Sequence, residues 1–433
     1  MKNLNFKINN IGSINNADLD LGKINIISGV NGSGKTTSSK ILYSYLVSNT
    51  SEGIDFHNRY IVNLFDKLLR FLHINIEPKI EDKLNDENNN DIFRKLRYIA
   101  EIFRNYYFFD DFDEIYMILE EIENEVEKKL NSKRFNALFN NLKNNLSMVE
   151  NTNKRINFIF HKLLNNEFNE DFNFNDSSYL IFNDNKFSFP LNESNTNGNF
   201  NNFHVNDIFY IETPYILDFN NKKPINNRNS DLLFHQESLI NNLYSSNSNK
   251  SDELYFDIPN INENTLKKIN NIINGNIYYD DEQRSFIYTS DIGYQCNIKN
   301  TAAGIKTIGI LQRLLSNELD TNSFIIMDEP EVHLHPSWQL KLAEIIVLLS
   351  CENNINFYIN SHSPQFIEAI EVYSRKYGLE NDTNFYFTKI HENSYQYDFI
   401  KVEKQNLHLL YKDLSGSYSI IDELSGKFLA DDF

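Results

Sequence analysis

The chain has 433 residues, more than one ordinary hydrophobic core accommodates, so two or three lobes are expected. Hydrophobic residues make up 41% of the sequence and aromatic residues 14%, which excludes a chain that is disordered throughout. The net charge of −19 excludes attraction to nucleic acid by the surface as a whole.

Localisation is indicated by what the sequence lacks. No apolar run approaches the ~18 residues that span a bilayer, and the polar opening MKNLNFKINN is unlike a secretory signal. The two cysteines, Cys296 and Cys351, do not have the spacing of a metal or redox site, which suits a reducing compartment. We therefore expect a cytoplasmic protein that does not enter a membrane.

The N-terminal segment predicts the start of an α/β domain. A hairpin is expected from Leu4–Ile8 and Ala17–Leu21, followed by a strand at Ile24–Ile27. Between that strand and a helix expected at Thr37–Leu46 lies GVNGSGKT, residues 29–36, which fits the phosphate-loop pattern GxxxxGK[ST]. This context predicts a nucleoside triphosphate site, because a loop at a helix N-terminus presents its N–H groups to phosphates.

The chemistry of this loop assigns roles to its residues. Lys35 can reach the β- and γ-phosphates, and the Thr36 hydroxyl can ligate Mg²⁺. The glycines let the backbone close around phosphate oxygens, where larger residues would block it. The predicted nucleotide-binding residues of the loop are Gly29, Asn31, Gly32, Ser33, Gly34, Lys35, Thr36 and Thr37.

The following segment, 49–170, is expected to be a helical insertion. Apolar residues recur at steps of three and four from Ile115 to Leu130, which indicates one buried helical face. The segment is too short and irregular for the long coiled-coil arm of a chromosome-maintenance ATPase. From Lys128 to Lys162 eight basic residues stand against a single acid, Glu150. This basic stripe could contact phosphates or an acidic partner, but the pattern favours a solvated helix face.

Strand signals return in the segment 171–215, and the segment 216–300 is expected to form a helical lobe. The segment 301–378 then completes the core, and 379–433 is expected to be a C-terminal hairpin and helix. The strands expected in these segments are Tyr179–Phe182, Lys186–Phe189, Asp207–Ile211, Ile277–Asp280, Ser285–Thr289, Phe324–Met327, Ile355–Ile359, Asn384–Ile390 and Tyr397–Val402, with a final helix at Leu407–Leu429.

The strand Phe324–Met327 ends in two carboxylates, Asp328 and Glu329. An uninterrupted apolar strand is typical of a parallel sheet that is covered on both faces. At the carboxyl end of such a strand, Asp328 is placed to hold Mg²⁺ through its hydration shell. Glu329 is placed to orient and polarise the water that attacks the γ-phosphate, so it is the predicted catalytic base.

Two further elements complete the predicted site. His362 follows the strand Ile355–Ile359 directly, where it can donate a hydrogen bond to the γ-phosphate and lose that contact on hydrolysis. Ala303 and Gly304 lie in a small-residue turn before a helix, and their N–H groups can reach an anion. The natural target of that turn is the γ-phosphate bound by a second copy of the chain.

In this order, the phosphate loop, the small-residue turn, the acidic strand and the histidine resemble an ABC-type ATPase outside the transporter branch. The run DEPEVHLHP at 328–336, followed by Trp338 and Gln339, resembles the OLD-like and "AAA family" ATPases of bacterial anti-phage defence systems, including the ATPase subunits of Septu and PARIS. The turn 303–309 and the strand 209–214 resemble the same ATPases. The resemblance covers nearly the whole chain, and its weakest part is 50–205.

The resemblance implies an α/β fold, a P-loop NTPase of ABC-ATPase type with a mixed sheet core, a helical insertion and a helical signature lobe. It implies ATP and Mg²⁺ as ligands, hydrolysis of ATP, and a homodimer or higher even oligomer. The lobes expected on this basis are 1–48, 49–170, 171–215, 216–300, 301–378 and 379–433.

The sequence departs from the family at the signature turn. The family's signature serine has no counterpart at Ala302 or Ala303, which leaves the Thr301 hydroxyl and the backbone amides at Gly304. Turnover is therefore expected to be slow or regulated by a partner. Glu212 is the candidate for the family's glutamine-loop residue.

The residues around the acidic pair argue against a histidine metal site and against a transporter subunit. His333 and His335 are expected to shape the turn beside Glu329 rather than to hold a metal. The serine-alanine-leucine-aspartate loop that is typical of transporters after the acidic pair is missing.

OLD proteins carry a nuclease domain after the ATPase, whereas here about 70 residues follow His362 and show no acidic nuclease cluster. The resemblance therefore implies an ATPase that controls a separate nuclease or toxin effector in anti-phage defence. Three alternatives stay open. They are a DNA-repair or recombination ATPase of the RecF and SMC kind, the ATP-binding subunit of a transporter, and a nucleotide-gated scaffold that scarcely hydrolyses ATP.

Overall fold

The computed structural model describes residues 4–76, 87–104, 112–129, 132–168, 174–183, 185–188, 196–197, 205–219, 232–244, 263–317, 319, 321–392, 394–416 and 421. The chain divides into two compact units. The first consists of Met1–Leu46 together with Leu163–Phe433, and the second is Val47–Lys162. Among the described residues, no helix is long and apolar enough to cross a membrane.

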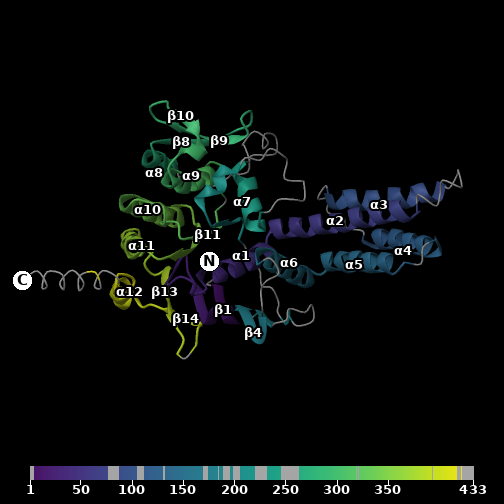
Figure 1. Ribbon diagram of the computed structural model, residues 1–433, viewed down its shortest axis with the longest axis horizontal. Coiled ribbons are helices and arrows are strands. Elements are labelled where there is room, and N and C mark those ends of the chain that lie inside the picture. Colours follow the sequence, from purple (N-terminus) through teal and green to yellow (C-terminus); the bar gives the residue numbers. More distant parts are fainter. Residues whose placement is uncertain are drawn as a thin grey trace, which may run out of the picture. The chain divides into compact units, whose positions relative to one another are not determined.

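The first unit is built on a mixed sheet of eleven described strands, in the order β6-β5-β4-β1-β2-β14-β13-β3-β12-β11-β7 (Figure 1). Strands β13, β3, β12, β11 and β7 are parallel neighbours, whereas β1, β2, β4, β5 and β6 join through antiparallel pairs. The strands are β1 Leu4–Ile11, β2 Ile14–Leu21, β3 Ile24–Ser28, β4 Phe174–Phe182, β5 Asn185–Ser188, β6 Thr196–Asn197, β7 Ile208–Ile211, β11 Phe324–Asp328, β12 Asn356–Ser361, β13 Thr383–Ile390 and β14 Tyr397–Lys401.

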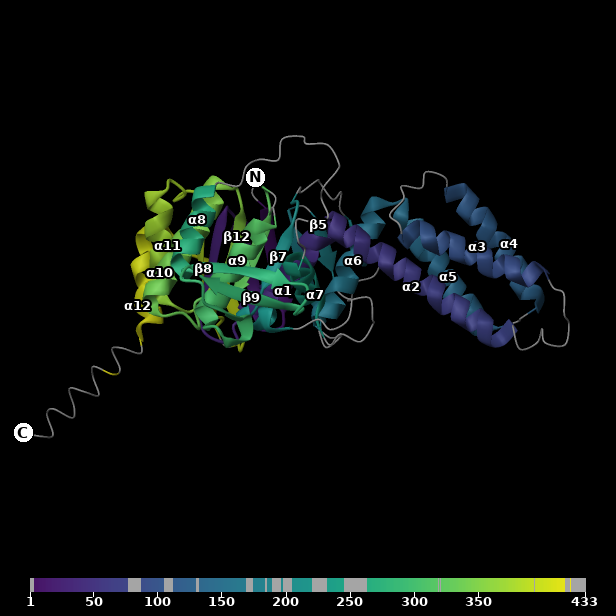
Figure 2. The same cartoon turned by 90° about the horizontal axis from the view of Figure 1, so that it is seen from above.

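The burial of the central strands explains their sequences. All residues of β3, β7 and β12 are buried, and so are the first four of β11, because helices cover both faces of the parallel part of the sheet. Outside the lobe described below, the helices that lie wholly in this unit are α10 Pro336–Glu352, α11 Pro364–Lys376 and α12 Leu407–Leu414. Helix α1, Lys35–Ser48, belongs to it up to Leu46, and helix α6, Thr152–Glu167, belongs to it only from Leu163. Helices α10, α11 and α12 lie side by side along one edge of the unit in both views (Figures 1 and 2).

The segment 216–300, expected to be a helical lobe with strands at Ile277–Asp280 and Ser285–Thr289, contains both kinds of element. It contains the helices α7 Phe234–Tyr244 and α8 Glu263–Ile273, but also a three-stranded antiparallel sheet in the order β10-β9-β8. Helix α9, Ala303–Ser316, packs on this sheet so closely that a Cβ at Gly309 would lie 2.0 Å from Ile277. The strands of this sheet are β8 Gly275–Asp280, β9 Ser285–Ser290 and β10 Gln295–Asn297.

The second unit is helical. Its helices α2 Ser51–Ile76, α3 Glu87–Arg104, α4 Phe112–Lys129 and α5 Lys133–Val149 enclose one apolar core. The predicted apolar face of α4 contributes Ile115, Leu119, Ile122 and Val126 to that core, whereas Leu130 lies outside the described residues.

The predicted elements around the phosphate loop are confirmed. The N-terminal hairpin is β1–β2, with Leu4 opposite Leu21, and β3 and α1 flank the loop as expected. At the C-terminus, β13 and β14 form the predicted hairpin, and the predicted helix is described as α12, Leu407–Leu414. The later part of that prediction, 417–420 and 422–429, lies outside the described residues.

Candidate functional site

The sheet order brings four segments of the chain to one edge. Strands β3, β12, β11 and β7 are parallel and adjacent, so their carboxyl ends meet at the same side of the sheet. The phosphate loop follows β3, and His362 follows β12. Asp328 is the last residue of β11, and Glu212 follows β7. The predicted catalytic and metal-binding residues therefore converge although they are far apart in sequence.

The phosphate loop places Lys35 at the first position of α1. Its Nζ donates hydrogen bonds to the carbonyl oxygens of Gly29, at 3.1 Å, and Val30, at 2.9 Å. Burial lowers the pKa of Lys35 to about 8, although the nearby carboxylates of Glu329 and Asp328 oppose this shift. Lys35 is thus held inside its own loop, beside the two acids that follow β11.

Thr388 of β13 contacts the phosphate loop from the neighbouring strand. The Thr388 hydroxyl donates to the Ser33 hydroxyl at 2.9 Å, and both side chains are buried. Gly29 has a φ of +140°, and a Cβ there would lie 1.8 Å from the Thr388 Oγ1 atom, so only glycine fits. Sequence reasoning missed Thr388, because an alternating strand gives no signal of which loop lies across from it.

The two predicted Mg²⁺ ligands touch each other. The Thr36 hydroxyl donates to Asp328 Oδ2 at 2.6 Å, across a separation of 292 residues. Asp328 also accepts from the Tyr210 hydroxyl at 3.2 Å and, at Oδ1, from the Asn360 amide at 2.9 Å. A hydroxyl and a carboxylate oxygen at this spacing are hard oxygen donors of the kind that Mg²⁺ prefers, so the residues present fit that ion.

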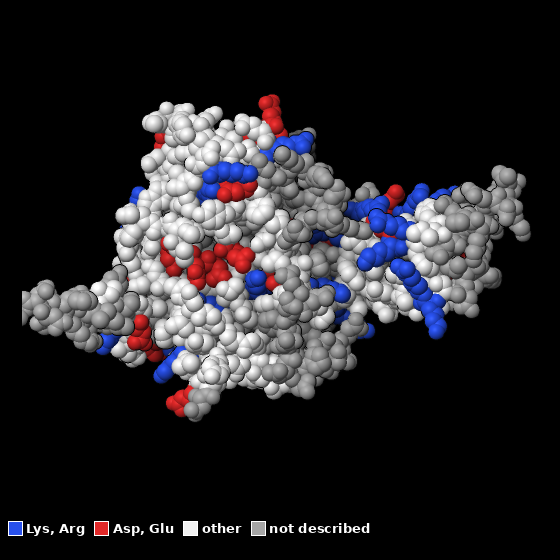
Figure 3. Space-filling model, in the orientation of Figure 1, with Lys and Arg blue, Asp and Glu red and all other residues white. Residues whose placement is uncertain are grey.

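Glu329 and His362 form a second close pair at this edge. The Nε2 atom of His362 lies 2.7 Å from Glu329 Oε1. Burial and the charge of Lys35 lower the pKa of His362, although Glu329 pulls it in the opposite direction. Glu329 adopts a left-handed backbone with φ +48°, and its N–H donates to the Asn360 carbonyl at 3.0 Å. A non-glycine residue in this conformation is strained, and such strain concentrates at functional sites. Figure 3 shows acidic side chains gathered on the face of the first unit.

Sequence reasoning also missed the role of Glu331. Its Oε1 atom accepts from the Ser361 hydroxyl at 2.5 Å and from the backbone N–H groups of His362 and Ser363 at 3.0 and 3.3 Å. Gln339 accepts from the Ser363 hydroxyl at 2.8 Å. These bonds fix the loop that carries His362. Glu331 belongs to the acidic run in the sequence, but only its burial distinguishes it from a surface acid.

The signature turn, residues 301–304, leads into the predicted helix, and contacts within the chain already engage Gly304 and Thr301. Helix α9 begins at Ala303, while Gly304 is buried. A Cβ at Gly304 would lie 3.0 Å from Trp338 and 3.1 Å from Leu334, so close packing accounts for this glycine. The Thr301 hydroxyl donates to the Ile298 carbonyl at 2.7 Å and is therefore occupied within its own turn. Contact of Ala303 and Gly304 with a second copy's nucleotide stays a prediction.

The remaining candidates have local partners. Glu212 contacts His235 at 3.3 Å and Gln236 at 3.2 Å. His335 accepts from the Ser337 N–H and so caps α10, while the ring of His333 packs edge-on against Tyr215. Among the described residues, no group of three or more His, Cys, Asp or Glu side chains is arranged to hold a metal ion.

Comparisons with known proteins give limited similarity. No protein-family model matches this sequence. A stretch of 55 residues is 40% identical to "Retron Ec83 probable ATPase" of Escherichia coli, which amounts to 13% of this chain and 10% of that protein's length.

Solved structures of SMC head domains were also matched. The "SMC head domain from Thermotoga maritima" is 9% identical, with a TM-score of 0.38, over 93% of this chain and 100% of that one. An SMC head with an extended coiled coil from Pyrococcus furiosus, bound to the C-terminal domain of ScpA, is also 9% identical. Its TM-score is 0.33, over 97% of this chain and 98% of that one. Because both scores lie below 0.5, the fold described here rests on the observed sheet topology.

Proposed function

We propose that this chain is an ABC-type ATPase that binds and hydrolyses Mg²⁺-ATP and uses the ATP state to control a separate effector protein. The nucleotide would lie on the phosphate loop, residues 29–36, facing Asp328, Glu329 and His362. The N-terminus of α9 from a second copy would complete the site, which makes the working unit a homodimer or a higher even oligomer.

One observation carries the proposal. The Thr36 hydroxyl and the Asp328 carboxylate meet at 2.6 Å at the shared edge of β3, β12 and β11. A phosphate-binding loop by itself indicates only an anion site. A loop whose final hydroxyl touches a carboxylate from a neighbouring strand supports a site for a phosphate group together with its divalent cation.

The side chains suggest how hydrolysis would proceed. Lys35, at the start of α1, would move its charge from the loop carbonyls to the β- and γ-phosphates. Glu329 would accept a hydrogen bond from the attacking water and polarise it. His362 would exchange its contact with Glu329 for the γ-phosphate, while Glu331 holds its backbone in place. Bound Mg²⁺ would neutralise charge on the phosphate oxygens.

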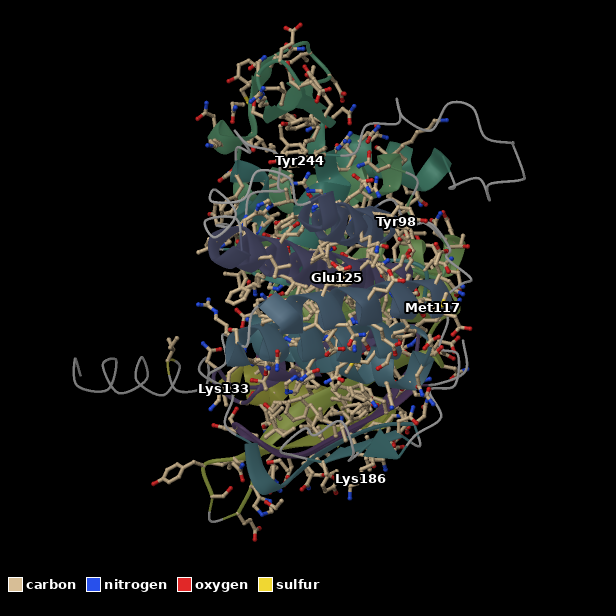
Figure 4. All side chains as sticks on the ribbon, turned by 90° about the vertical axis from the view of Figure 1, so that its right-hand side faces the viewer. Tyr98, Met117, Glu125, Lys133, Lys186 and Tyr244 are labelled. Carbon is tan, nitrogen blue, oxygen red and sulfur yellow. The ribbon has the colours of Figure 1, made fainter. Side chains whose placement is uncertain are left out.

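The biological role proposed first is regulation of a nuclease or toxin in anti-phage defence. The 55-residue match to a probable ATPase of a retron supports the ATPase part, as does the resemblance of the run 328–336 to defence ATPases. The helical second unit offers apolar side chains to a partner. Tyr98 is 47% exposed and Met117 is 61% exposed, and both are labelled in Figure 4.

Hydrolysis is tested with purified protein by measuring ATP binding and phosphate release for wild type, Lys35→Ala and Glu329→Gln. We expect Lys35→Ala to weaken ATP binding, and Glu329→Gln to bind ATP but release phosphate roughly 10²- to 10⁴-fold more slowly. Light scattering of Glu329→Gln with Mg²⁺-ATP should show a dimer. Equal phosphate release from wild type and Glu329→Gln would favour the nucleotide-gated scaffold over the ATPase.

The effector is tested by gentle affinity purification from the native host, followed by mass spectrometry. A nuclease or toxin-like protein in stoichiometric amount supports the proposed role. Co-purification with DNA-repair proteins would replace it with the repair or recombination alternative, and co-purification with a membrane protein would indicate a transporter subunit.

A DNA-repair or recombination ATPase is the second candidate, and the exposed lysines of the second unit favour it. Lys133 and Lys154 are exposed, and Lys133 is labelled in Figure 4. Other members of the stripe are engaged within the unit. Lys143 pairs with Glu123, and Arg155 donates to Asn58 at 2.7 Å. The side chains of Lys128 and Lys129 lie outside the described residues.

A further inference from the structure

A buried histidine lies between two carboxylates behind the candidate site. His235, the second residue of α7, has its Nδ1 atom 2.6 Å from Glu167 Oε2 and its Nε2 atom 3.3 Å from Glu212 Oε2. The side chains of His235 and Glu167 are fully buried. Both ring nitrogens face carboxylate oxygens, an arrangement that favours a ring protonated at both nitrogens.

The same cluster fixes where three elements of the first unit end or begin. Glu167 is the last residue of α6, and its Oε1 atom accepts from the His235 N–H at 3.1 Å. The neighbouring Asn166 accepts from the Phe234 N–H at 2.8 Å, so α6 caps the first turn of α7. Glu212 follows β7 and lies 4.0 Å from Lys40 of α1. The histidine is therefore held from α6 and from the end of β7, and its ring cannot turn without breaking buried bonds.

Tyr210 connects this cluster to Asp328. Its side chain is fully buried, and its ring packs against the His235 ring with 4.6 Å between centroids and against the Tyr43 ring at 5.9 Å. The Tyr210 hydroxyl donates to Asp328 Oδ2 at 3.2 Å.

We infer that Tyr210 is a positioning residue that holds the Asp328 carboxylate in the orientation needed for a divalent cation beside Thr36, and that His235 with Glu167 and Glu212 holds Tyr210. This inference rests on the proposed function. It adds a support that lies behind Asp328 and is assembled from α6, α7 and β7.

The chemistry of Mg²⁺ makes such a support consequential. This ion requires near-octahedral oxygen ligands and usually keeps several waters, so a carboxylate that holds it through those waters has to be oriented correctly. Asn360 holds Oδ1 of Asp328, while Thr36 and Tyr210 hold Oδ2. Without the phenol, the Thr36 hydroxyl is the remaining described donor to Oδ2, and it would also have to face the cation. Residues that orient a metal ligand in this way typically contribute 10- to 100-fold to metal affinity.

The principal test is Tyr210→Phe, which keeps the buried ring and removes only the hydroxyl. Binding of a fluorescent, non-hydrolysable ATP analogue is titrated at a series of Mg²⁺ concentrations and in EDTA. We expect the Mg²⁺ concentration for half-maximal binding to rise about tenfold or more, with affinity in EDTA unchanged. The matched control is Tyr386→Phe, because Tyr386 is equally buried but its hydroxyl bonds to the Asp20 backbone at 2.9 Å. The control should have the Mg²⁺ dependence of wild type.

A second variant tests whether the histidine cluster acts through Tyr210. Glu167→Gln should shift the Mg²⁺ dependence in the same direction as Tyr210→Phe, and it should add little when combined with Tyr210→Phe. A purely structural role of Glu167 would instead give additive effects in the double variant and would overturn the second half of the inference.

The two levels of proposal fail in different ways. Wild type that binds no ATP analogue, with or without Mg²⁺, overturns the proposed function and this inference together. Wild type with Mg²⁺-dependent binding that Tyr210→Phe leaves unchanged overturns only this inference.

Discussion

The carboxylate of Glu331 holds the backbone of His362, with Glu331 Oε1 3.0 Å from the His362 nitrogen. The same oxygen accepts from the Ser361 hydroxyl and the Ser363 N–H, so three donors of one loop converge on it. Glu331 is 2% exposed, and burial raises the pKa of its carboxyl. The histidine proposed to sense the γ-phosphate is thus held in place by a buried acid two residues after Glu329.

Replacing Glu331 by alanine should therefore impair the loop rather than ATP binding. Buried donors without an acceptor cost about 1–3 kcal/mol each, so Glu331→Ala should lower the free energy of unfolding by at least that amount. Denaturant unfolding measures the loss, and Glu344→Ala is the control. Glu344 lies on α10 and accepts from Tyr377 at 2.6 Å, away from this loop. Equal losses in the two variants would contradict the role given to Glu331.

ATP binding should take up a proton in mildly alkaline solution. The pKa of Lys35 is about 8 in the protein, and phosphate oxygens beside the ammonium would raise it. Affinity should accordingly fall as the pH rises above about 8, because Lys35 loses its charge in the free protein. Calorimetry in buffers of different ionisation enthalpy measures proton uptake, which should be larger at higher pH.

The variant Lys35→Arg provides the control for proton uptake, because its side chain stays charged throughout this range. It should bind ATP without the uptake, even if its affinity is lower. Uptake that persists in Lys35→Arg would assign the proton to another group.

Two glycines of the phosphate loop should differ in their tolerance of alanine. At Gly29 a Cβ would meet the Thr388 hydroxyl at 1.8 Å, whereas at Gly32 nothing lies within 4 Å among the described residues. Both have positive φ, so both variants carry backbone strain of about 1–3 kcal/mol, to which Gly29→Ala adds the clash with Thr388. We expect Gly29→Ala to be destabilised clearly more than Gly32→Ala in denaturant unfolding. A similar loss in both would mean that Thr388 yields without cost.

The pair of His235 and Glu212 should make the free energy of unfolding fall both at acid pH and at alkaline pH. Hydrogen bonds to Glu167 and Glu212 raise the pKa of His235 above 6.5, against the opposing effect of burial. The stabilisation from protonated His235 is fully present below about pH 6.5. It is lost from the free energy of unfolding as the pH rises through the pKa that His235 has in the folded protein. The bond from His235 lowers the pKa of Glu212 to about 2, so that contribution is complete above about pH 4.5 and is lost as the pH falls towards 2.

This window is checked with His235→Gln, which cannot become charged. The difference in free energy of unfolding between wild type and His235→Gln should be largest between about pH 4.5 and 6.5. The titratable groups that face His235 are Glu167, Glu212, Tyr210 and Tyr43. A difference that does not vary with pH would show that the ring is neutral in the folded protein.

The DNA-repair alternative can be tested without damaging the second unit. Charge reversal at Lys133 and Lys154 changes exposed side chains, whereas reversal at Arg155 would also break its bond to Asn58. If DNA binds through the stripe, Lys133→Glu with Lys154→Glu should weaken binding and make it less dependent on salt. Binding that is unchanged by this double variant would rule out these two lysines as DNA contacts.

The sequence was sufficient for those parts of the site that are encoded locally. Strand, loop and helix around Lys35 follow from a short pattern, and the carboxyl end of the strand before Asp328 follows from its apolar run. The parallel arrangement then places Asp328 next to Thr36. Each of these predictions needed only a few neighbouring residues and one general property of parallel sheets.

The supporting residues could not be predicted in the same way. Thr388, Tyr210 and Glu331 matter because of partners that are distant in the sequence or hidden by burial. Tyr210 belongs to a short strand whose residues are all apolar or aromatic, so nothing distinguishes its hydroxyl from the others. In the three-stranded sheet within 216–300, β8 and β9 were predicted, whereas β10 was not, because a strand of three residues gives no periodic signal.

The left-handed backbone of Glu329 implies a trade-off between stability and activity. Glycine would adopt φ +48° without strain, whereas glutamate does so at a cost of about 1–2 kcal/mol. Local folding preferences therefore oppose the side chain that the proposed reaction needs most. Given the catalytic role proposed for Glu329, Glu329→Gly is expected to give a protein that is more stable but less active.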